Sequence, residues 1–146
     1  MVLIQVVVGI VFVERLFQDV SRQMTKAVSI DIKHLIELTA SDKDILEIAK
    51  SLQIDTIWVD NPDFDTPDRY RDFFDFAGWY VIETLHEEVP EVQVVDLARS
   101  RGAVYVLANI DGHGLEFRIL RNRVSARNPH QLLVYMVSSA FLLSVL

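Results

Sequence analysis

The stretch Val2-Leu-Ile-Gln-Val-Val-Val-Gly-Ile-Val-Phe-Val13 opens the segment that decides the fold, and this segment continues to Leu38. The opening run carries no charge, and at Glu14 it passes into a charged segment without a proline or a turn cluster. Beyond Glu14 apolar residues recur with the period of one face of an α-helix. These residues are Phe17, Val20, Met24, Val28, Ile32 and Leu35. We therefore predict a single helix over Val2–Leu38, about 55 Å long at roughly 1.5 Å per residue.

A second apolar run, Leu132–Leu146, ends the chain and also contains no charge. Asn128-Pro129 precedes it and is a strong helix start, with Asn as the N-cap and Pro at the first helical position. A membrane span needs about 20 apolar residues, and each of the two runs is shorter than that. We therefore expect each end of the chain to be part of a transmembrane helix, with Met1 and Leu146 inside the two helices.

This interpretation divides the chain into three parts. Residues 1–13 are expected to end the first transmembrane helix, residues 14–128 to form one domain, and residues 129–146 to begin the second transmembrane helix. The β-branched residues Val6–Val8 leave an alternative open, in which the first run is a buried strand and the periodic segment after it is an ordinary core helix.

The composition excludes several classes of protein. The 146 residues carry a formal net charge of -7, and no basic stripe interleaves with aromatic residues, so no nucleic-acid partner is expected. The chain has no cysteine, which rules out a disulfide framework and thiol chemistry. No nucleophile–base pair, phosphate-binding loop or metal signature is legible, so we predict no catalytic residue and no cofactor.

Between the apolar ends the sequence predicts two shorter helices and four strands. Ser41 and Asp44 have the spacing of a capping-box variant at the start of a short helix. Thr66-Pro67 has the same character, for a helix that continues to about Val89. The strands are expected at Ile54–Val59, Val92–Leu97, Ala103–Ile110 and Leu115–Leu120.

The last two predicted strands alternate apolar and polar residues, as antiparallel strands with one buried face do. Asp111-Gly112-His113-Gly114 between them predicts a hairpin turn. Trp58 and the aromatic group Phe73–Trp79 are expected in the core. The predicted fold class is α+β, with a long N-terminal helix, a four-strand, mainly antiparallel sheet that carries its helices on one face, and the chain ends side by side.

The densest acidic cluster lies around the start of the second predicted helix, and carboxylate oxygens are the ligands that Ca²⁺ and Mg²⁺ prefer. The candidate cation-binding residues are Asp63, Asp65, Asp68 and Asp72. A solvated loop with acids at a helix start is the competing interpretation, because Arg69 and Arg71 can neutralise several carboxylates and no EF-hand pattern is complete.

The long predicted helix carries more apolar surface than one contact requires. Leu16, Ala27 and Ile30 form a second, weaker stripe beside the main one. A helix with two apolar stripes can pack on its own domain and on a second copy of itself. We predict a homodimer whose interface is formed by residues of the main stripe, namely Phe17, Val20, Met24 and Val28.

Both ends of the chain carry motifs of a known family. The segment Gln5-Val-Val-Val-Gly-Ile-Val-Phe-Val-Glu-Arg-Leu-Phe-Gln-Asp-Val-Ser-Arg-Gln-Met24 resembles the first membrane helix of osmosensor-type (EnvZ-like) transmembrane histidine kinases of proteobacteria and its periplasmic continuation. Val20-Ser-Arg-Gln-Met24 fits the family pattern Val-[Ser/Thr]-Arg-x-[Leu/Met]. The segment from Gly112 to Leu146 resembles the last sensor strand of that family entering its second membrane helix.

The resemblance implies that residues 14–128 are a periplasmic sensor domain, homodimeric and PAS-like, anchored in the bacterial inner membrane through both termini. It implies kinase modules beyond residue 146, so that this fragment is not itself an enzyme. The expected function is the stimulus-sensing input domain of a two-component sensor histidine kinase, which relays a signal to the cytoplasm through a helical dimer. The alternative is a membrane-anchored periplasmic interaction or assembly module without a signalling role.

Overall fold

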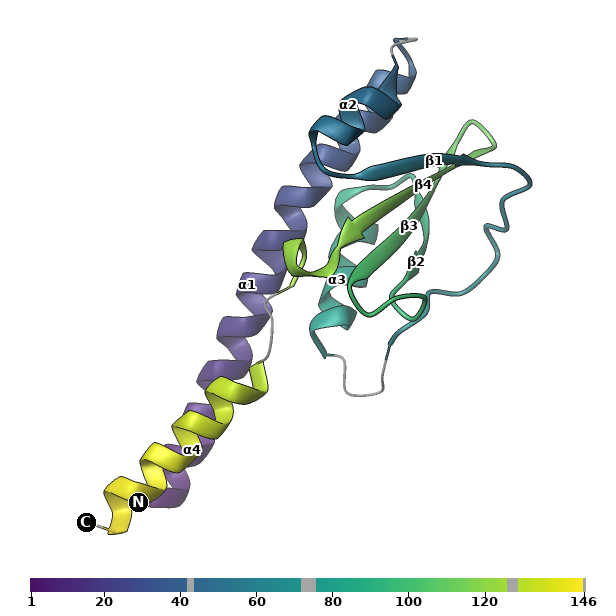
Figure 1. The fold of residues 1–146 in the computed structure, drawn as a ribbon. Helices are drawn as coiled ribbons and strands as arrows, with labels where there is room; N and C mark the ends of the chain where they lie inside the picture. Colours follow the sequence, from purple (N-terminus) through teal and green to yellow (C-terminus); the bar gives the residue numbers. More distant parts are fainter. Residues whose placement is uncertain (42–43, 72–75, 126–128, 146) are drawn as a thin grey trace.

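The computed structural model describes residues 1–41, 44–71, 76–125 and 129–145, which form a mixed α+β fold (Figure 1). The predicted fold class is confirmed at this level. The described helices are α1 (Val2–Thr39), α2 (Ile45–Ser51), α3 (Phe76–Glu88), the 3-10 helix η1 (Arg121–Arg123) and α4 (Pro129–Val145). The described strands are β1 (Asp55–Val59), β2 (Val92–Asp96), β3 (Ala103–Ile110) and β4 (His113–Leu120).

Helix α1 is continuous from the apolar opening run into the core of the domain, as the unbroken period predicts. Val6–Val8 lie inside it, so the alternative of a buried N-terminal strand is wrong. Val28, Ile32 and Leu35 are buried and belong to the main hydrophobic cluster. The hydroxyl of Ser29, buried on the same helix, donates to the carbonyl oxygen of Thr25 at 2.8 Å, so this polar group is satisfied within α1.

The four strands form one antiparallel sheet in the order β1-β4-β3-β2, which confirms the predicted sheet. One face of the sheet packs on α1 and α3 in a single hydrophobic cluster. The sheet residues of this cluster follow the alternation of the sequence, and they include Val104, Val106, Ala108, Leu115, Phe117 and Ile119. Helices α1 and α3 therefore cover the same face of the sheet, and neither of them covers the opposite face.

The hairpin between β3 and β4 is tighter than its sequence predicts. Asp111 and Gly112 alone form the turn, with φ angles of 52° and 85°. Two consecutive positive φ angles are typical of a type I′ turn, which matches the twist of the flanking strands. The amide of Gly112 donates to the side chain of Asn109 at 2.9 Å, and β4 begins at His113, earlier than the predicted Leu115.

Both predicted helix starts in the middle of the chain are corrected. Asp44, and not Ser41, is the N-cap of α2, because its side chain accepts a hydrogen bond from the amide of Leu46. Thr66-Pro67 does not begin a helix, and residues 72–75 lie outside the described part of the chain. Instead the backbone of Arg69 pairs with β2, through the amide of Arg69 to Val95 O at 3.0 Å and the amide of Leu97 to Arg69 O at 2.8 Å. This parallel bridge holds the segment extended.

The expectation of aromatic residues in the core is wrong for both tryptophans. Trp58 lies on β1 at the edge of the sheet and Trp79 lies on the outer side of α3, and each keeps about half of its surface exposed. Phe73 and Phe74 fall outside the described residues. The core of the sheet is filled by aliphatic residues and Phe117 instead.

The two chain ends lie at the same end of the molecule, where α4 runs beside the first turns of α1 (Figure 1). Gly9 allows close packing there, since a β-carbon at this position would lie 3.3 Å from the terminal methyl of Met136. Within residues 1–41, 44–71, 76–125 and 129–145, no helix combines the length and the apolar character that crossing a membrane requires. The predicted transmembrane helices are therefore not shown and stay a prediction.

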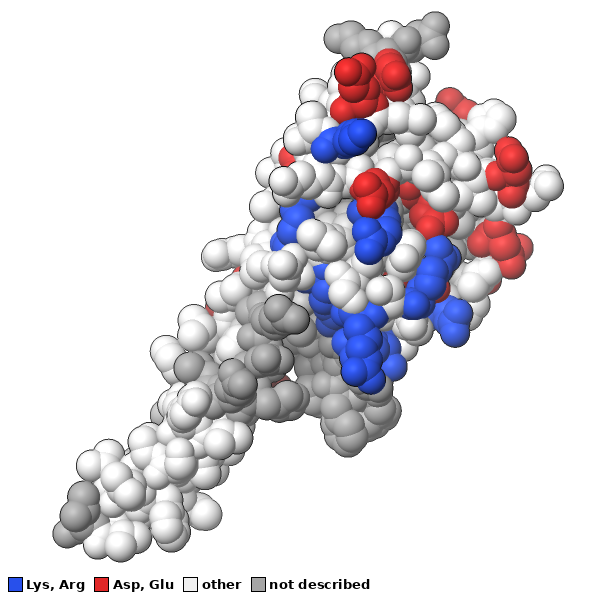
Figure 2. All heavy atoms as spheres, viewed as in Figure 1, with Lys and Arg blue, Asp and Glu red and all other residues white. Residues whose placement is uncertain are grey.

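Charges divide the surface of the domain along its length. Figure 2 shows acidic side chains gathered toward the end that lies away from the chain termini, and basic side chains across the part nearer α4. The paired ends of α1 and α4 show neither sign of charge in this view. In this view the charged side chains therefore lie on the globular part.

Candidate functional site

Apolar and polar side chains lie beside each other on the outer face of the sheet. The register aligns Val94 with Leu107, and Leu107 with Glu116. Two residues away on each strand, it aligns Asp96 with Tyr105. Residues that face each other across antiparallel strands lie on the same side of the sheet, so these groups form one continuous surface.

The loop after β1 folds over this surface and is attached at both ends. At its start Pro62 lies against Gly114, where an added β-carbon would come within 2.7 Å of the proline side chain. Asp63 then shapes the loop, because its carboxylate accepts hydrogen bonds from the amide of Asp65 at 3.1 Å and the hydroxyl of Thr66 at 2.8 Å. The loop returns to the sheet at Arg69, whose backbone pairs with β2.

A pocket of about 290 Å³ lies between this loop and the sheet. Its walls come from the loop, from the four strands of the sheet and from the turn after β2. The lining residues are Val59, Asn61, Pro62, Asp63, Thr66, Arg69, Val94, Asp96, Arg99, Tyr105, Leu107 and Glu116. We name it the outer-face pocket.

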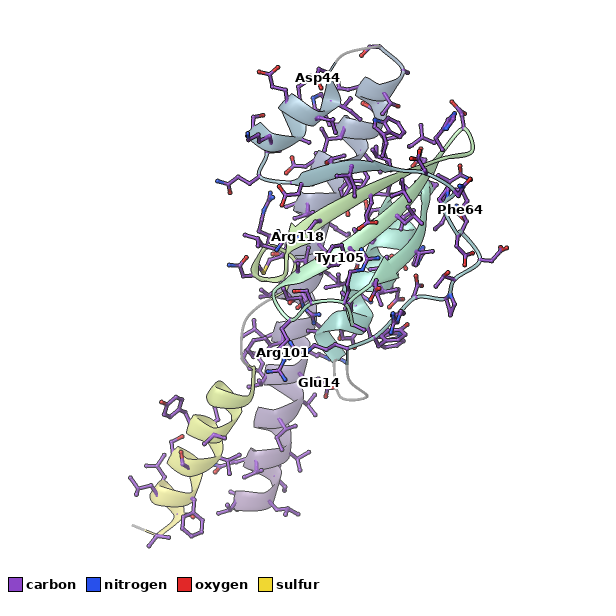
Figure 3. All side chains as sticks on the ribbon, turned by 45° about the vertical axis from the view of Figure 1, so that its right-hand side comes forward. Glu14, Asp44, Phe64, Arg101, Tyr105 and Arg118 are labelled. Carbon is purple, nitrogen blue, oxygen red and sulfur yellow. The ribbon has the colours of Figure 1, made fainter. Side chains whose placement is uncertain are left out.

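Tyr105 in the wall of this pocket is fixed from the neighbouring strand. Figure 3 shows Tyr105 and Arg118 on adjacent strands, where the register pairs them. A hydrogen bond to Tyr105, and then the ion pair with Asp55 at 3.1 Å, raise the pKa of Arg118 further above its already high ordinary value. The guanidinium of Arg118 therefore keeps its positive charge.

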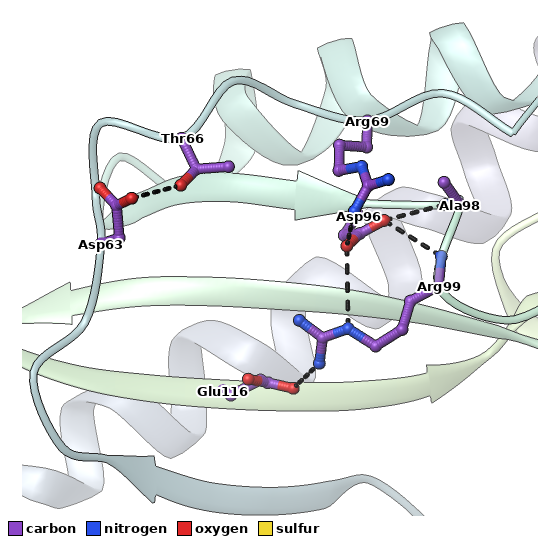
Figure 4. A network of polar contacts seen from close by, with 7 residues as sticks. All are labelled: Asp63, Thr66, Arg69, Asp96, Ala98, Arg99 and Glu116. Atoms are coloured by element: carbon purple, nitrogen blue, oxygen red, sulfur yellow. Dashed lines mark hydrogen bonds and ion pairs between the residues drawn. The ribbon is translucent and has the colours of Figure 1, made fainter.

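An ion-pair network crosses the pocket (Figure 4). The guanidinium of Arg99 lies 2.6 Å from Glu116 Oε1, 3.7 Å from Asp96 Oδ2, and 4.2 Å from the ring centroid of Tyr105. Asp96 is largely buried and also accepts from the amides of Ala98 and Arg99, at 2.9 and 3.2 Å. Both partners of Arg99 and the aromatic ring hold its guanidinium in one place.

Arg69 is held much more loosely. Its Nη1 lies 3.9 Å from Asp96 Oδ2, beyond hydrogen-bonding distance, and 61% of its side chain is exposed. The backbone of Arg69 is nevertheless fixed by its pairing with β2. Among the described residues, the guanidinium of Arg99 in the outer-face pocket is hydrogen-bonded to Glu116, whereas that of Arg69 makes only the longer ion pair with Asp96.

The structure gives different partners to the described carboxylates of the predicted cation site. Asp63 is used in the loop turn described above, and Asp65 is exposed. Asp68 accepts from the amide of Val95 at 2.8 Å and pairs with His86 Nε2 at 2.8 Å. Asp72 lies outside the described residues. In the part of the chain that the structure describes, no three His, Asp or Glu side chains are grouped so that they could hold a metal ion.

The residues of the predicted dimer interface share one side of α1 but differ in burial. Val28 is only 3% exposed and packs in the core of its own chain. Phe17, Val20 and Met24 are half-buried. The weaker stripe is the open one, since Leu16, Ala27 and Ile30 are exposed.

Sequence reasoning missed the outer-face pocket. The strand alternation predicts Glu116 on the outer side of its strand, and the local sequence places Arg99 in a turn, but neither signal joins them to Arg69. A charged residue at an outward strand position is normally a solvated one. Only the course of the loop over the sheet turns these positions into a pocket.

No protein-family model, no curated protein and no solved structure matches this chain.

Proposed function

We propose that the chain is the extracytoplasmic input domain of a two-component sensor histidine kinase, homodimeric and anchored in the bacterial inner membrane through α1 and α4. The periplasmic location and the PAS-like architecture rest on the resemblance of the two chain ends to EnvZ-like kinases. The observation that carries the proposal is the arrangement of these ends. One unbroken helix joins the apolar opening run to the domain core, and the second apolar helix leaves beside it.

The paired ends expose an apolar surface that water does not favour. Exposed large apolar residues of this kind mark a membrane or protein contact when they are contiguous. On α1 they are Val2, Leu3, Ile4, Val7, Val8, Ile10, Val11 and Phe12, and on α4 they are Val134, Tyr135, Met136, Val137, Phe141, Leu142, Leu143 and Val145. Close contact at a glycine, as at Gly9, is also usual between helices in lipid.

A second support is the rigid connection between the sheet and α1. Thr25 Oγ1 lies 2.9 Å from the carbonyl oxygen of Val124, in the segment that leaves the sheet toward α4. Arg123 in the same segment pairs with Asp31 of α1 at 3.3 Å. A displacement of the sheet therefore moves α1, on which α4 packs, and a stimulus acts only if it favours one of two such arrangements.

The homodimer uses the open face of α1 in this proposal. Leu16, Ala27 and Ile30 are available to a second copy, whereas Val28 stays in its own core. Half-buried Val20 and Met24 border this face and remain at the edge of the interface. Packing two copies along α1 sets the four outgoing helices in one bundle.

The absence of cysteine from the chain makes its topology directly testable. Asp65→Cys adds one thiol to the exposed loop, and Val28→Cys adds one to the core as a buried control. In right-side-out membrane vesicles a membrane-impermeant maleimide is expected to label the Asp65→Cys protein and to leave the Val28→Cys protein unlabelled. Labelling of Asp65→Cys only in inverted vesicles contradicts the proposed location.

The alternative function is a membrane-anchored periplasmic interaction or assembly module. Such a module would have the same membrane topology, but a movement of its helices would not change the output of a fused kinase. Fused to the cytoplasmic half of a well-behaved sensor kinase, the chain is expected to change kinase output when one residue is inserted after Val145, since the insertion rotates α4 by about 100° relative to the fused kinase half. Unchanged output across insertions of one, two and three residues favours the inert module.

A further inference from the structure

The outer-face pocket has no role in the packing of the core, and its lining combines features of a ligand site. We propose that it binds a free α-amino acid with an apolar side chain. The inference goes beyond the proposed function and does not rest on it, because binding at the pocket is measured without any signal crossing a membrane.

The size of the pocket limits the ligand. Sites for small molecules enclose about 300–1,000 Å³, so a pocket of about 290 Å³ is just below the smallest of these. This volume equals that of roughly ten water molecules in the liquid. An amino acid with a short aliphatic side chain fits, and a peptide or a nucleotide does not.

The floor of the pocket selects the side chain. Val59, Val94 and Leu107 line it from three strands, and Pro62 closes it from the loop. Val94 is almost completely buried although it lies on the outer face of the sheet, since the loop covers it. An aliphatic group of the ligand displaces water from this floor, which is the favourable term for a small apolar side chain.

The charges of the lining select a zwitterion. The pocket contains the guanidinium groups of Arg69 and Arg99 against the carboxylates of Asp63, Asp96 and Glu116. A ligand that carries only a negative charge is repelled by the excess of carboxylates in the lining and by the net charge of -7 on the whole chain. A cation alone leaves Arg69 with only its longer ion pair to Asp96 among the described residues, so a ligand with both charges satisfies the lining best.

The two charged groups of an amino acid have separate places. The loosely held guanidinium of Arg69 offers parallel donors to a carboxylate, which is the geometry that arginine forms best. Arg99 does not bind the ligand carboxylate, because Glu116, Asp96 and Tyr105 already hold its guanidinium. Asp63, on the loop, and Glu116, on β4, also line the pocket, and the remaining lone pairs of their carboxylates can accept from the ammonium group (Figure 4).

The test titrates the complete chain, in detergent micelles, by isothermal calorimetry. The probes are L-leucine, its decarboxylated analogue 3-methylbutylamine and its deaminated analogue 4-methylpentanoate, followed by L-valine and L-alanine. We expect at least one of the amino acids to bind, and each single-charge analogue to bind at least about 10-fold more weakly, because each analogue loses a hydrogen-bonded charge. The same ligand raises the Tm of the chain as its concentration exceeds its Kd.

Arg69→Gln is the diagnostic variant and Arg101→Gln the matched control. Both changes remove one exposed guanidinium, and Arg101 does not line the pocket. We expect Arg69→Gln to weaken amino-acid binding about 10- to 100-fold and Arg101→Gln to leave it unchanged. Unchanged far-ultraviolet circular dichroism shows that both variants fold.

Three outcomes overturn the inference. The first is that none of the three amino acids binds. The second is that the amine or the acid binds as tightly as the amino acid, which assigns a simple cation or anion site. The third is that Arg101→Gln weakens binding as much as Arg69→Gln. Each outcome leaves the topology and kinase-output experiments unaffected, so a failure here is distinct from a failure of the proposed function.

Discussion

Arg123 Nη2 lies 3.3 Å from Asp31 Oδ2, so the turn after the last strand is tied to the C-terminal part of the first helix. Through Nη1 the same guanidinium donates to the carbonyl oxygens of Leu52 and Gln53, at 3.0 and 3.3 Å. Those carbonyls belong to the end of α2, where the last turn of a helix leaves its acceptors without partners in the helix. One side chain thus joins η1, α1 and α2.

We expect Arg123→Ala to lower the free energy of unfolding by about 1–3 kcal/mol, since it leaves two carbonyls and a carboxylate without their donor. Arg123→Lys keeps the charge and loses the planar fork, so its effect is expected between those of alanine and wild type. Urea denaturation of the chain in micelles, followed by circular dichroism, measures both.

The control for Arg123 is Arg101→Ala, at an exposed position in the turn between β2 and β3. Its effect is expected to stay within about 0.5 kcal/mol, as for most surface substitutions. Equal losses for the two variants would show that charge, and not the bridge to Asp31, determines the effect.

At Gly114 one close contact determines how a substitution affects stability. An alanine there brings a β-carbon within 2.7 Å of Pro62 Cβ and 3.3 Å of Leu107 Cδ1, so the loop over the sheet has to move. We expect Gly114→Ala to destabilise the fold by about 1–3 kcal/mol, as over-packing does. It is also expected to weaken any ligand of the outer-face pocket, because Pro62 is part of its wall.

Gly102→Ala is the matched control for Gly114, since a β-carbon at Gly102 meets nothing within 4 Å. Thermal unfolding of the two variants side by side compares the same chemical change at a crowded and an open site. A Gly114→Ala protein as stable as Gly102→Ala would mean that the loop does not rest on the sheet at this point.

Much of the fold can be predicted from the sequence where local pattern and tertiary structure agree. Helix α1 is correct over nearly its full length because its apolar period continues from Phe17 to Leu35 without a break. The buried faces of β3 and β4 are correct because their alternation leaves one register that buries Phe117 and exposes Arg118.

The errors arise where a distant partner overrides a local signal. Thr66-Pro67 has the chemistry of a helix start, but the backbone of Arg69 finds its hydrogen bonds on β2. The main stripe of α1 is correct as an apolar face, yet its Val28 packs on the protein's own core, and a single sequence does not say which of two stripes faces a second copy. The outer-face pocket cannot be predicted from local sequence patterns either, because Arg69 and Glu116 come together only in the folded chain.

Asp68 tests whether the acidic loop serves the fold or a cation. Its carboxylate accepts from the amide of Val95 and pairs with His86, which ties the loop to both β2 and α3. Without any added cation, Asp68→Asn is expected to lower the free energy of unfolding by about 1–2 kcal/mol, because the amide keeps only part of these contacts.

Asp65→Asn, at an exposed position of the same loop, is the control and is expected to be neutral. Titration of the wild-type chain with CaCl₂ completes the test. A Tm that rises with Ca²⁺ in wild type and fails to rise in Asp68→Asn would restore the cation site predicted from the sequence.

The open face of α1 gives a prediction that separates folding from association. Ile30 is 68% exposed, whereas Ile32, two residues further along the same helix, is completely buried. Ile30→Glu is expected to leave the free energy of unfolding of each chain within about 0.5 kcal/mol of wild type. It is expected to weaken the dimer, because two carboxylates then face each other across the interface. Ile32→Ala is expected to lower stability by about 2–5 kcal/mol through the cavity that it leaves.

Sedimentation equilibrium in density-matched micelles measures association, and urea denaturation measures folding on the same samples. Met24→Glu separates the two possible interfaces, because Met24 belongs to the main stripe and is half-buried. If the interface lies on the open face, Ile30→Glu shifts the equilibrium toward monomer more than Met24→Glu does. The reverse order would return the interface to the main stripe, and Val28 would then have to leave the core of its own chain for the dimer to form.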